Sequence, residues 1–390
     1  MFFQPVRAIG IYVHIPYCKQ RCTYCDFYFV TNHSSSALFT ERLVDEIRLR
    51  AHTHPREVAI ETIYFGGGTP SRLSDDHLAR ILGALYDYFP VDAPKEVTLE
   101  VNPEDVTPNR IQTWKDLGIN RLSIGIQTFD EQTLKTIHRS HSTQQASAVL
   151  SAAMEAKISI SADLIFGLPG SSRGNWSRDL ERLLAFSPQH ISVYGLTVEP
   201  NTPLSKGLKQ GSITVPDEDF QAEAFREAHV ILTGSGYSHY EVSSYAKPGF
   251  EAIHNTNYWR HTPYIGLGPA AHSMSRRGRH VIRTSNVRSL TSWIDLLTQA
   301  ESPQVDSDHL SIEDVMNEVI MLGLRTRQGI HLDDLNALGL DLLDEKGPAI
   351  DDLVGRKLLA FDYPYLRATL EGWLFLNTIT AQLLLDDDLA

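Results

Sequence analysis

The residues that stand out first are three cysteines placed close together. The chain contains only three, Cys18, Cys22 and Cys25, in a C-x3-C-x2-C spacing. Three thiolates can bind three corners of a [4Fe–4S] cubane, which normally takes four protein ligands. Because there is no fourth cysteine, one iron would keep an open position, which is what a cluster uses for chemistry.

Two other kinds of site use closely spaced cysteines. Cys22 and Cys25 alone have the spacing of a thioredoxin-type dithiol, but that interpretation leaves Cys18 without a role. A structural zinc site would need a fourth ligand such as His14, and zinc knuckles usually supply two separated ligand pairs. The cluster interpretation is therefore favoured over both.

A second group of candidates lies where predicted strands end. The glycine-rich segment Gly66–Thr69 would let the backbone approach a ligand closely. Glu100, Gln127 and Asp163 lie in or at the end of later apolar runs, where an unpaired charge is costly. A carboxylate there can accept two hydrogen bonds from ribose hydroxyls, and Arg139 could balance its charge. The simpler interpretation is a tight turn and structural salt bridges.

The first half of the chain has a regular secondary-structure pattern that would position these residues. Apolar, β-rich runs alternate with amphipathic stretches, which is typical of βα units around a parallel sheet. The runs are Gly10–Ile15, Ala59–Phe65, Glu96–Val101, Arg121–Thr128, Ser159–Phe166 and His190–Val198. We predict an α/β fold with a partial (β/α)6 TIM-type barrel, an open doubly wound sheet being the competitor. The cysteine loop would lie at the barrel mouth.

The alternation of apolar runs and amphipathic stretches ends after residue 205. A long helix over Asp217–Leu232 leads into an aromatic, histidine-rich segment that ends near His280. Short helices follow from residue 305, and Glu371-Gly372 predicts a hairpin turn before an apolar last helix. We predict a small winged-helix-like α+β domain at the C-terminus. The expected division is 1–205 for the barrel, 206–304 for a barrel extension and 305–390 for the small domain.

Composition excludes some partners. The chain has 390 residues and a formal net charge of −13, which argues against binding a nucleic-acid backbone. No apolar run approaches the ~20 residues needed to span a bilayer, and Met1–Gly10 does not resemble a signal peptide. We expect a cytoplasmic protein. Peripheral membrane association cannot be read from the sequence.

The cysteine motif after the first strand, with Gly-Gly-Gly-Thr-Pro after the second, resembles the radical S-adenosylmethionine (SAM) superfamily. The resemblance implies that SAM chelates the open iron and that one electron from the cluster cleaves its sulfonium to a 5′-deoxyadenosyl radical. A flavodoxin or ferredoxin would be the usual reductant. The positions that match the nucleoside contacts of the family are Tyr12, Gly67, Gly68, Thr69, Glu100, Gln127, Arg139 and Asp163.

The segment from Tyr12 to Cys18, Tyr-Val-His-Ile-Pro-Tyr-Cys, narrows the resemblance to one branch of the superfamily. That branch contains oxygen-independent coproporphyrinogen III oxidases and haem chaperones. The oxidases carry another cysteine two positions after the third ligand, where this chain has Phe27. The resemblance therefore implies a haem chaperone that binds haem and transfers it to a haem-accepting protein. The oxidase is the alternative, and no catalytic residue is assigned.

A second signature supports the same branch. His254-Asn-Thr-Asn-Tyr258-Trp259 resembles the His-Asn-x-x-Tyr-Trp sequence of the chaperones. His254 could be an axial haem ligand, and Tyr258 and Trp259 offer flat faces to a porphyrin. The simpler alternative is a capped turn with a hydrogen-bonded histidine and two core aromatics. His239, His261 and His272 are rival ligands.

Overall fold

Six parallel strands in chain order form the centre of the fold. The computed structural model describes residues 6–385. The strands are β1 (Ala8–Ile15), β2 (Ala59–Gly67), β3 (Glu96–Val101), β4 (Arg121–Gln127), β5 (Ser159–Phe166) and β6 (His190–Gly195). They belong to a 12-stranded sheet of order β12-β11-β10-β9-β1-β2-β3-β4-β5-β6-β8-β7.

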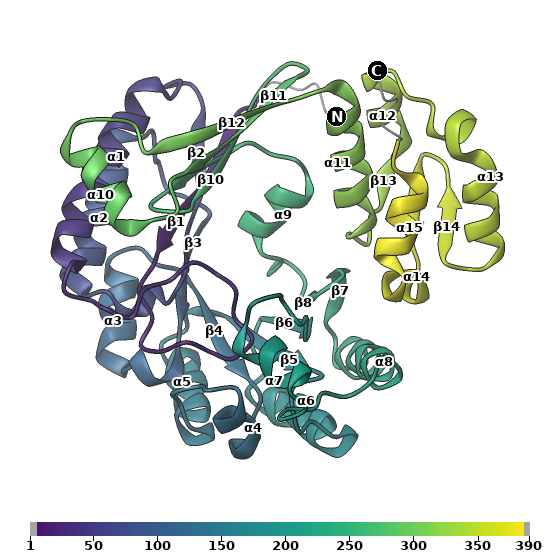
Figure 1. Ribbon diagram of the computed structural model, residues 1–390, viewed down its shortest axis with the longest axis horizontal. Helices are drawn as coiled ribbons and strands as arrows, with labels where there is room; N and C mark the ends of the chain where they lie inside the picture. Colours follow the sequence, from purple (N-terminus) through teal and green to yellow (C-terminus); the bar gives the residue numbers. More distant parts are fainter. Residues whose placement is uncertain (1–5, 386–390) are drawn as a thin grey trace.

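Helices between these strands cover the outer face of the curved sheet (Figure 1). They are α1 (Ser36–Thr53), α2 (Asp75–Tyr88), α3 (Pro108–Asp116), α4 (Glu131–Thr136), α5 (Thr143–Glu155) and α6 (Arg173–Phe186). Neighbouring strands follow chain order, so every crossover winds the same way, whereas a doubly wound sheet would reverse its order. The predicted α/β partial barrel is confirmed.

The segment predicted as an extension adds strands to both ends of the same sheet. Next to β1 lie β9 (Tyr264–Leu267), which is parallel to it, and then antiparallel β10 (His272–Arg277), β11 (His280–Asn286) and β12 (Gln304–Leu310). Next to β6 lie antiparallel β8 (Ser244–Ala246) and β7 (Ser238–Glu241). The helices of this segment are α7 (Pro203–Lys209), α8 (Glu218–Gly234), α9 (Ile253–Trp259) and α10 (Leu290–Thr298).

The C-terminal part packs short helices around a three-stranded sheet beside the open side of the barrel (Figure 1). Its strands are β13 (Ile330–His331), β14 (Leu359–Asp362) and β15 (Tyr365–Ala368). Its helices are α11 (Ile312–Leu324), α12 (Leu332–Leu338), α13 (Leu342–Gly355), α14 (Leu370–Leu374) and α15 (Leu376–Leu383).

The predicted hairpin turn at Glu371-Gly372 is wrong. The hairpin joins β14 to β15 through Tyr363-Pro364, and Glu371-Gly372 lies in α14. The reason is a helix cap, because the Thr369 hydroxyl accepts a hydrogen bond from the Gly372 N–H at 2.9 Å.

Candidate functional site

The loop between β1 and α1 carries the three cysteines and is closed at its base by the backbone. The Cys18 N–H donates to the Val30 carbonyl at 2.9 Å, and the Val30 N–H donates to the Pro16 carbonyl at 2.7 Å. All three cysteines are free thiols and half-buried. The loop therefore holds its thiols at the carboxyl end of β1, where the sequence predicted them.

The three thiols of the loop act electrostatically on one another. Burial raises the pKa of Cys18 to about 11, and the nearby Cys25 and Cys22 add to the rise, so the three thiols are close neighbours. Among residues 6–385, no three His, Cys, Asp or Glu side chains converge on one metal position. In a cubane each thiolate binds a different iron, so convergence is not required. His14 is occupied elsewhere, which weakens the zinc interpretation.

The glycines after β2 are closely surrounded by other parts of the protein, so that a side chain on any of them would collide. A Cβ on Gly66 would lie 3.1 Å from a carboxylate oxygen of Glu100. A Cβ on Gly67, where φ is +108°, would lie 2.5 Å from the His14 ring. The Gly68 N–H donates to the Ile15 carbonyl at 2.8 Å, which fixes this segment against the cysteine loop. The absence of side chains thus lets this segment pack tightly against the cysteine loop, His14 and Glu100, and Gly67 lines the neighbouring cavity.

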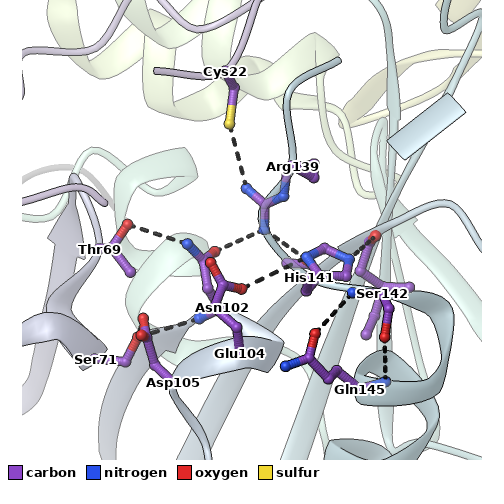
Figure 2. A network of polar contacts seen from close by, with 12 residues as sticks. Cys22, Thr69, Ser71, Asn102, Glu104, Asp105, Arg139, His141, Ser142 and Gln145 are labelled. Carbon is purple, nitrogen blue, oxygen red and sulfur yellow. Dashed lines mark hydrogen bonds and ion pairs between the residues drawn. The ribbon is translucent and has the colours of Figure 1, made fainter. Parts of the chain in front are cut away.

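Arg139 connects the cysteine loop to the strand ends (Figure 2). Its Nη2 donates to Asn102 Oδ1 at 2.7 Å and to the Gly125 carbonyl at 2.8 Å, and its Nη1 lies 3.7 Å from Cys22 Sγ. Asn102 in turn donates to the Thr69 hydroxyl at 3.3 Å. The Thr69 hydroxyl donates to Cys18 Sγ at 3.4 Å. Two predicted residues, Thr69 and Arg139, therefore contact cysteines directly.

Asn102 is a member of this network that the sequence reasoning missed. The available signal was its position, directly after the strand that ends in Glu100-Val101 and before a proline. Its side chain uses its oxygen for Arg139 and its nitrogen for Thr69, so it fixes both. An aspartate here could not donate to the hydroxyl.

His141 supports the same region from behind (Figure 2). Its Nε2 lies 3.2 Å from the Ile126 carbonyl, and its Nδ1 lies 3.8 Å from a Glu104 oxygen. Burial, with the charge of Arg139, lowers the pKa of His141 to about 3, so the imidazole is neutral. It holds the end of β4, where Gln127 adopts a left-handed φ of +67°.

Glu100 is a half-buried carboxylate near the end of β3. The Tyr64 hydroxyl donates to it at 2.8 Å. Burial raises the pKa of Glu100 to about 7. The hydrogen bond from Tyr64 lowers this pKa by less than burial raises it, and the charge of Asp163 raises it further. Asp163 is held by the Ser123 hydroxyl at 3.1 Å, and burial raises its pKa as well.

A cavity of about 620 Å³ extends from this carboxylate to the edge of the sheet. Its inner end is formed by Tyr12, Gly67 and Glu100, and one wall by Tyr258 and Tyr264. Its mouth is lined by Phe27, Tyr28, His272, Arg288, Val305 and Asp306. Two smaller hollows of about 410 Å³ each lie around α6, on the outside of the barrel. The other predicted site residues do not line the cavity: Gly68, Thr69, Gln127, Arg139, Asp163, His254 and Trp259.

Helix α9 lies inside the curve of the sheet and begins at a buried carboxylate (Figure 1). Glu96 accepts from the Ile253 N–H at 2.7 Å and from the His254 N–H at 3.4 Å. The His254 ring is buried, with Nδ1 2.8 Å from the Thr62 hydroxyl and Nε2 2.9 Å from the Tyr258 hydroxyl. Burial lowers the pKa of His254 to about 3.

Aromatic rings continue from α9 to the cavity. His254 stacks on Tyr64 with centroids 5.1 Å apart, and Tyr64 stacks on Tyr12 at 6.1 Å. Tyr258 packs edge-on against Tyr264 at 4.8 Å. Trp259 instead turns away and lies under the Arg325 guanidinium at 5.3 Å. The segment thus contributes one wall residue, Tyr258, and a histidine that fixes it.

The same wall is fastened to the C-terminal part of the chain. Glu318 of α11 accepts two hydrogen bonds from Arg283, at 2.8 and 2.9 Å, and also bonds to His261. Arg283 donates to the Tyr264 hydroxyl at 3.4 Å. One carboxylate of α11 therefore links the segment after α9 to β11 behind the cavity.

Comparison with known proteins gives consistent results. The model of the "Radical SAM superfamily" matches residues 12–183, and that of the "HemN C-terminal domain" matches residues 310–375. A relative from Synechocystis sp. named "Heme chaperone HemW" is 36% identical over 340 residues, covering 84% of this chain and 80% of the relative. One of the same name from Escherichia coli is 33% identical, covering 95% and 97%.

The solved structure of coproporphyrinogen III oxidase (HemN) from Escherichia coli superposes with a TM-score of 0.83. It covers 98% of this chain and 91% of that one at 21% sequence identity, so the similarity is one of fold. No helix within residues 6–385 combines the length and the apolar character needed to cross a membrane.

Proposed function

This chain belongs to the radical SAM superfamily, within the family whose members are named heme chaperone HemW, and from that membership we propose that it binds haem and transfers it to an acceptor protein. A [4Fe–4S] cluster and SAM take part. Haem is the cargo in this proposal, whereas the cluster and SAM are resident cofactors. The alternative is an oxygen-independent coproporphyrinogen III oxidase.

Cys18, Cys22 and Cys25 would hold the cluster, and the residues around the inner end of the cavity would hold SAM. When bound, the pair supplies one-electron chemistry. The backbone at Gly67 and Gly68 offers polar groups to the methionine part, beside Thr69 and Arg139. Glu100 would accept the ribose hydroxyls, with Tyr12 beside it. Gln127 and Asp163 would support the residues that contact SAM, since neither of the two lines the cavity.

The observation that carries the haem proposal is the set of residues that line the cavity. The cavity continues beyond Glu100 into a mouth with flat rings and a cation, which suits a planar, apolar ring with acidic side chains. Phe27 at this mouth is 68% exposed, and it occupies the position of the additional oxidase cysteine. An exposed phenyl ring favours a stacking surface over a further thiol.

His254, Tyr258 and Trp259 remain the proposed haem segment, each with a separate role. Tyr258 would contact the ring, because it lines the cavity. His254 would hold Tyr258 in place through the 2.9 Å hydrogen bond. Trp259 packs under Arg325 and would stabilise the end of α9.

We further propose a flavodoxin- or ferredoxin-type reductant and a cytoplasmic location. An exposed three-thiolate cluster needs a reducing compartment, where thiols are not lost to disulfides. The acceptor would approach the mouth of the cavity, where Phe27 and Val305 are exposed to solvent.

The test is one anaerobic sample reconstituted with iron and sulfide and assayed in two ways. We expect haem to bind at one equivalent per chain and to move to apomyoglobin, used as a model acceptor. We expect no conversion of coproporphyrinogen III to protoporphyrinogen IX. Turnover of coproporphyrinogen III would establish the oxidase alternative instead.

A matched variant tests haem binding separately from cluster binding. Replacing all three cysteines by serine removes the cluster ligands and leaves the mouth of the cavity unchanged. We expect this variant to lose cluster iron and its absorbance but to keep haem binding. Loss of haem binding in both proteins would contradict the proposal.

A further inference from the structure

We propose that His272, at the beginning of edge strand β10, is the residue that binds the haem iron at the mouth of the cavity. This inference rests on the proposed haem binding and assigns its ligand. The sequence offered several histidines for this role, and the structure separates them by two criteria. A ligand must reach the cavity, and it must have a ring nitrogen that the protein does not already use.

The other histidines near the site fail one or both criteria. His254 is 1% exposed and uses both ring nitrogens, for Thr62 and Tyr258. His14 lines the cavity but lies with Nδ1 3.3 Å from the Tyr12 hydroxyl and Nε2 3.1 Å from the Tyr28 carbonyl.

Two further histidines lie outside the cavity altogether. His239 is stacked on Tyr245 with centroids 3.9 Å apart, and its ring nitrogens lie 3.0 Å from His229 and 3.3 Å from the Val242 carbonyl. His261 is buried and bonds to Glu318 of α11. Neither could reach a ligand at the mouth without a rearrangement of the core.

His272 meets both criteria. It is exposed, it lines the mouth, and within residues 6–385 its ring takes part in no hydrogen bond or ion pair. The residue after it, Ser273, points to the opposite face, where its hydroxyl accepts from the Gly266 N–H at 2.9 Å and from Arg50 at 3.1 Å. Because side chains alternate along a strand, the His272 ring is directed to the cavity face.

The backbone around His272 is held closely, which gives the ring a defined position. A Cβ on Gly266 would lie only 1.9 Å from the His272 carbonyl oxygen, so a glycine is required there. Gly268, where φ is +95°, similarly approaches the His14 carbonyl, at 2.5 Å from a Cβ. The β9–β10 connection is thereby pressed against the end of β1.

The surroundings suit the rest of a haem molecule. Phe27 and Tyr258 offer apolar ring surface, which haem needs on its faces. Among the described residues that line the cavity, Arg288 carries a guanidinium, which can pair with a propionate, whereas Asp26 and Asp306 carry carboxylates. Imidazole is a common protein ligand of haem iron. A mouth with one accessible imidazole and one guanidinium therefore matches the iron and the carboxylate of the same molecule.

The experiment is a haem titration of the full-length chain and its variants, followed by the Soret band and by electron paramagnetic resonance. We expect His272→Ala to weaken haem binding by about tenfold or more, since even outer-shell partners of a metal are worth 10–100-fold in affinity. Its Soret band should shift, and added imidazole should restore the original spectrum. His280→Ala, on the adjoining strand β11 and outside the cavity, is the control and should resemble the unaltered chain.

Metal-free protoporphyrin IX separates an iron ligand from a wall residue. We expect His272→Ala to bind it within about twofold of the unaltered chain, because no iron is present to coordinate. An equal loss for haem and for the metal-free ring would overturn iron ligation by His272. So would an unchanged spectrum in His272→Ala, or a Soret shift only in His254→Ala. If the unaltered chain binds no haem, the proposed function itself fails.

Discussion

The Glu100 carboxylate has two requirements that oppose each other. In the proposed SAM site it would accept two ribose hydroxyls with both oxygens only when ionised, yet its surroundings raise its pKa to about 7, chiefly through burial. An acid whose pKa is higher in the folded than in the unfolded chain loses stability as pH rises between the two values. For Glu100 this window runs from its ordinary value of 4.5 to about 7.

We therefore expect Glu100→Gln to stabilise the ligand-free protein by about 1–3 kcal/mol at pH 8. At pH 5 the substitution should alter the stability little. The same substitution should abolish SAM binding. Denaturant unfolding at both pH values and isothermal titration with SAM measure the two effects. Glu155→Gln, exposed on α5, is the control. A variant less stable than the unaltered chain at pH 8 would show that the hydrogen bond from Tyr64 outweighs the burial cost.

Gly68 is a residue whose missing side chain matters. A Cβ there would lie 2.9 Å from the backbone oxygens of Ile15 and Tyr17, neither of which can move without displacing the cysteine loop. We expect Gly68→Ala to cost about 1–3 kcal/mol of stability and to lower the iron bound per chain by more than half. Gly83→Ala, on an exposed position of α2 with open space around it, should instead stabilise by about 0.5–1 kcal/mol.

At the scale of elements, α9 is held in the barrel by polar contacts with strands far away in the chain. Glu96 of β3 caps its first turn, and Thr62 of β2 bonds to His254 across 192 positions. A Cβ on Gly10 would lie 3.0 Å from the His254 ring, so β1 also makes room for the helix. These contacts explain how a seven-residue helix keeps one orientation.

We expect Thr62→Val to cost about 1–3 kcal/mol, because it leaves a buried imidazole nitrogen without its partner. Thr53→Val, exposed at the end of α1, should change stability by less than about 0.5 kcal/mol. Equilibrium unfolding by urea compares the two. Equal costs would mean that the bond to His254 contributes nothing to stability.

The sequence predicts which residues lie at the strand ends, but it does not predict the surroundings of the histidines. The cysteines and the strand-end residues Glu100 and Gln127 are placed by chain order, since parallel strands end at one edge. The surroundings of His254 are set by Thr62 and Tyr258, and only the folded sheet brings Thr62 to it. The exposure of His272 depends on how closely Gly266 allows β10 to approach, which no local pattern reveals.

At the scale of the whole molecule, the contacts between the barrel and the C-terminal part include a buried aromatic pair and an exposed charged pair. Trp373 packs edge-on against His239 of the barrel with ring centroids 4.6 Å apart, and its indole N–H is held within the C-terminal part by the Leu324 carbonyl at 3.0 Å. Arg226 of α8 donates to both oxygens of Glu371, at 2.7 and 2.6 Å, in an exposed pair. Burial makes the first contact the stronger one.

We expect Trp373→Ala to cost about 3–5 kcal/mol, and Glu371→Gln at most about 1 kcal/mol. Raising the salt concentration should reduce the cost of Glu371→Gln and leave the cost of Trp373→Ala unchanged. Thermal unfolding followed by circular dichroism at low and high salt provides the comparison. A large cost for Glu371→Gln would show that this exposed pair contributes more to the interface than the buried aromatic contact.

The Glu318 carboxylate limits how this protein can be shortened or joined to other proteins. A chain that ended at Leu310 would keep every strand of the large sheet but would lose the group that binds His261 and Arg283. Arg283 contacts Tyr264, so the loss would reach the cavity wall. A minimal version that retains the complete wall must therefore include α11, and a fusion partner is better placed after α15 than before α11.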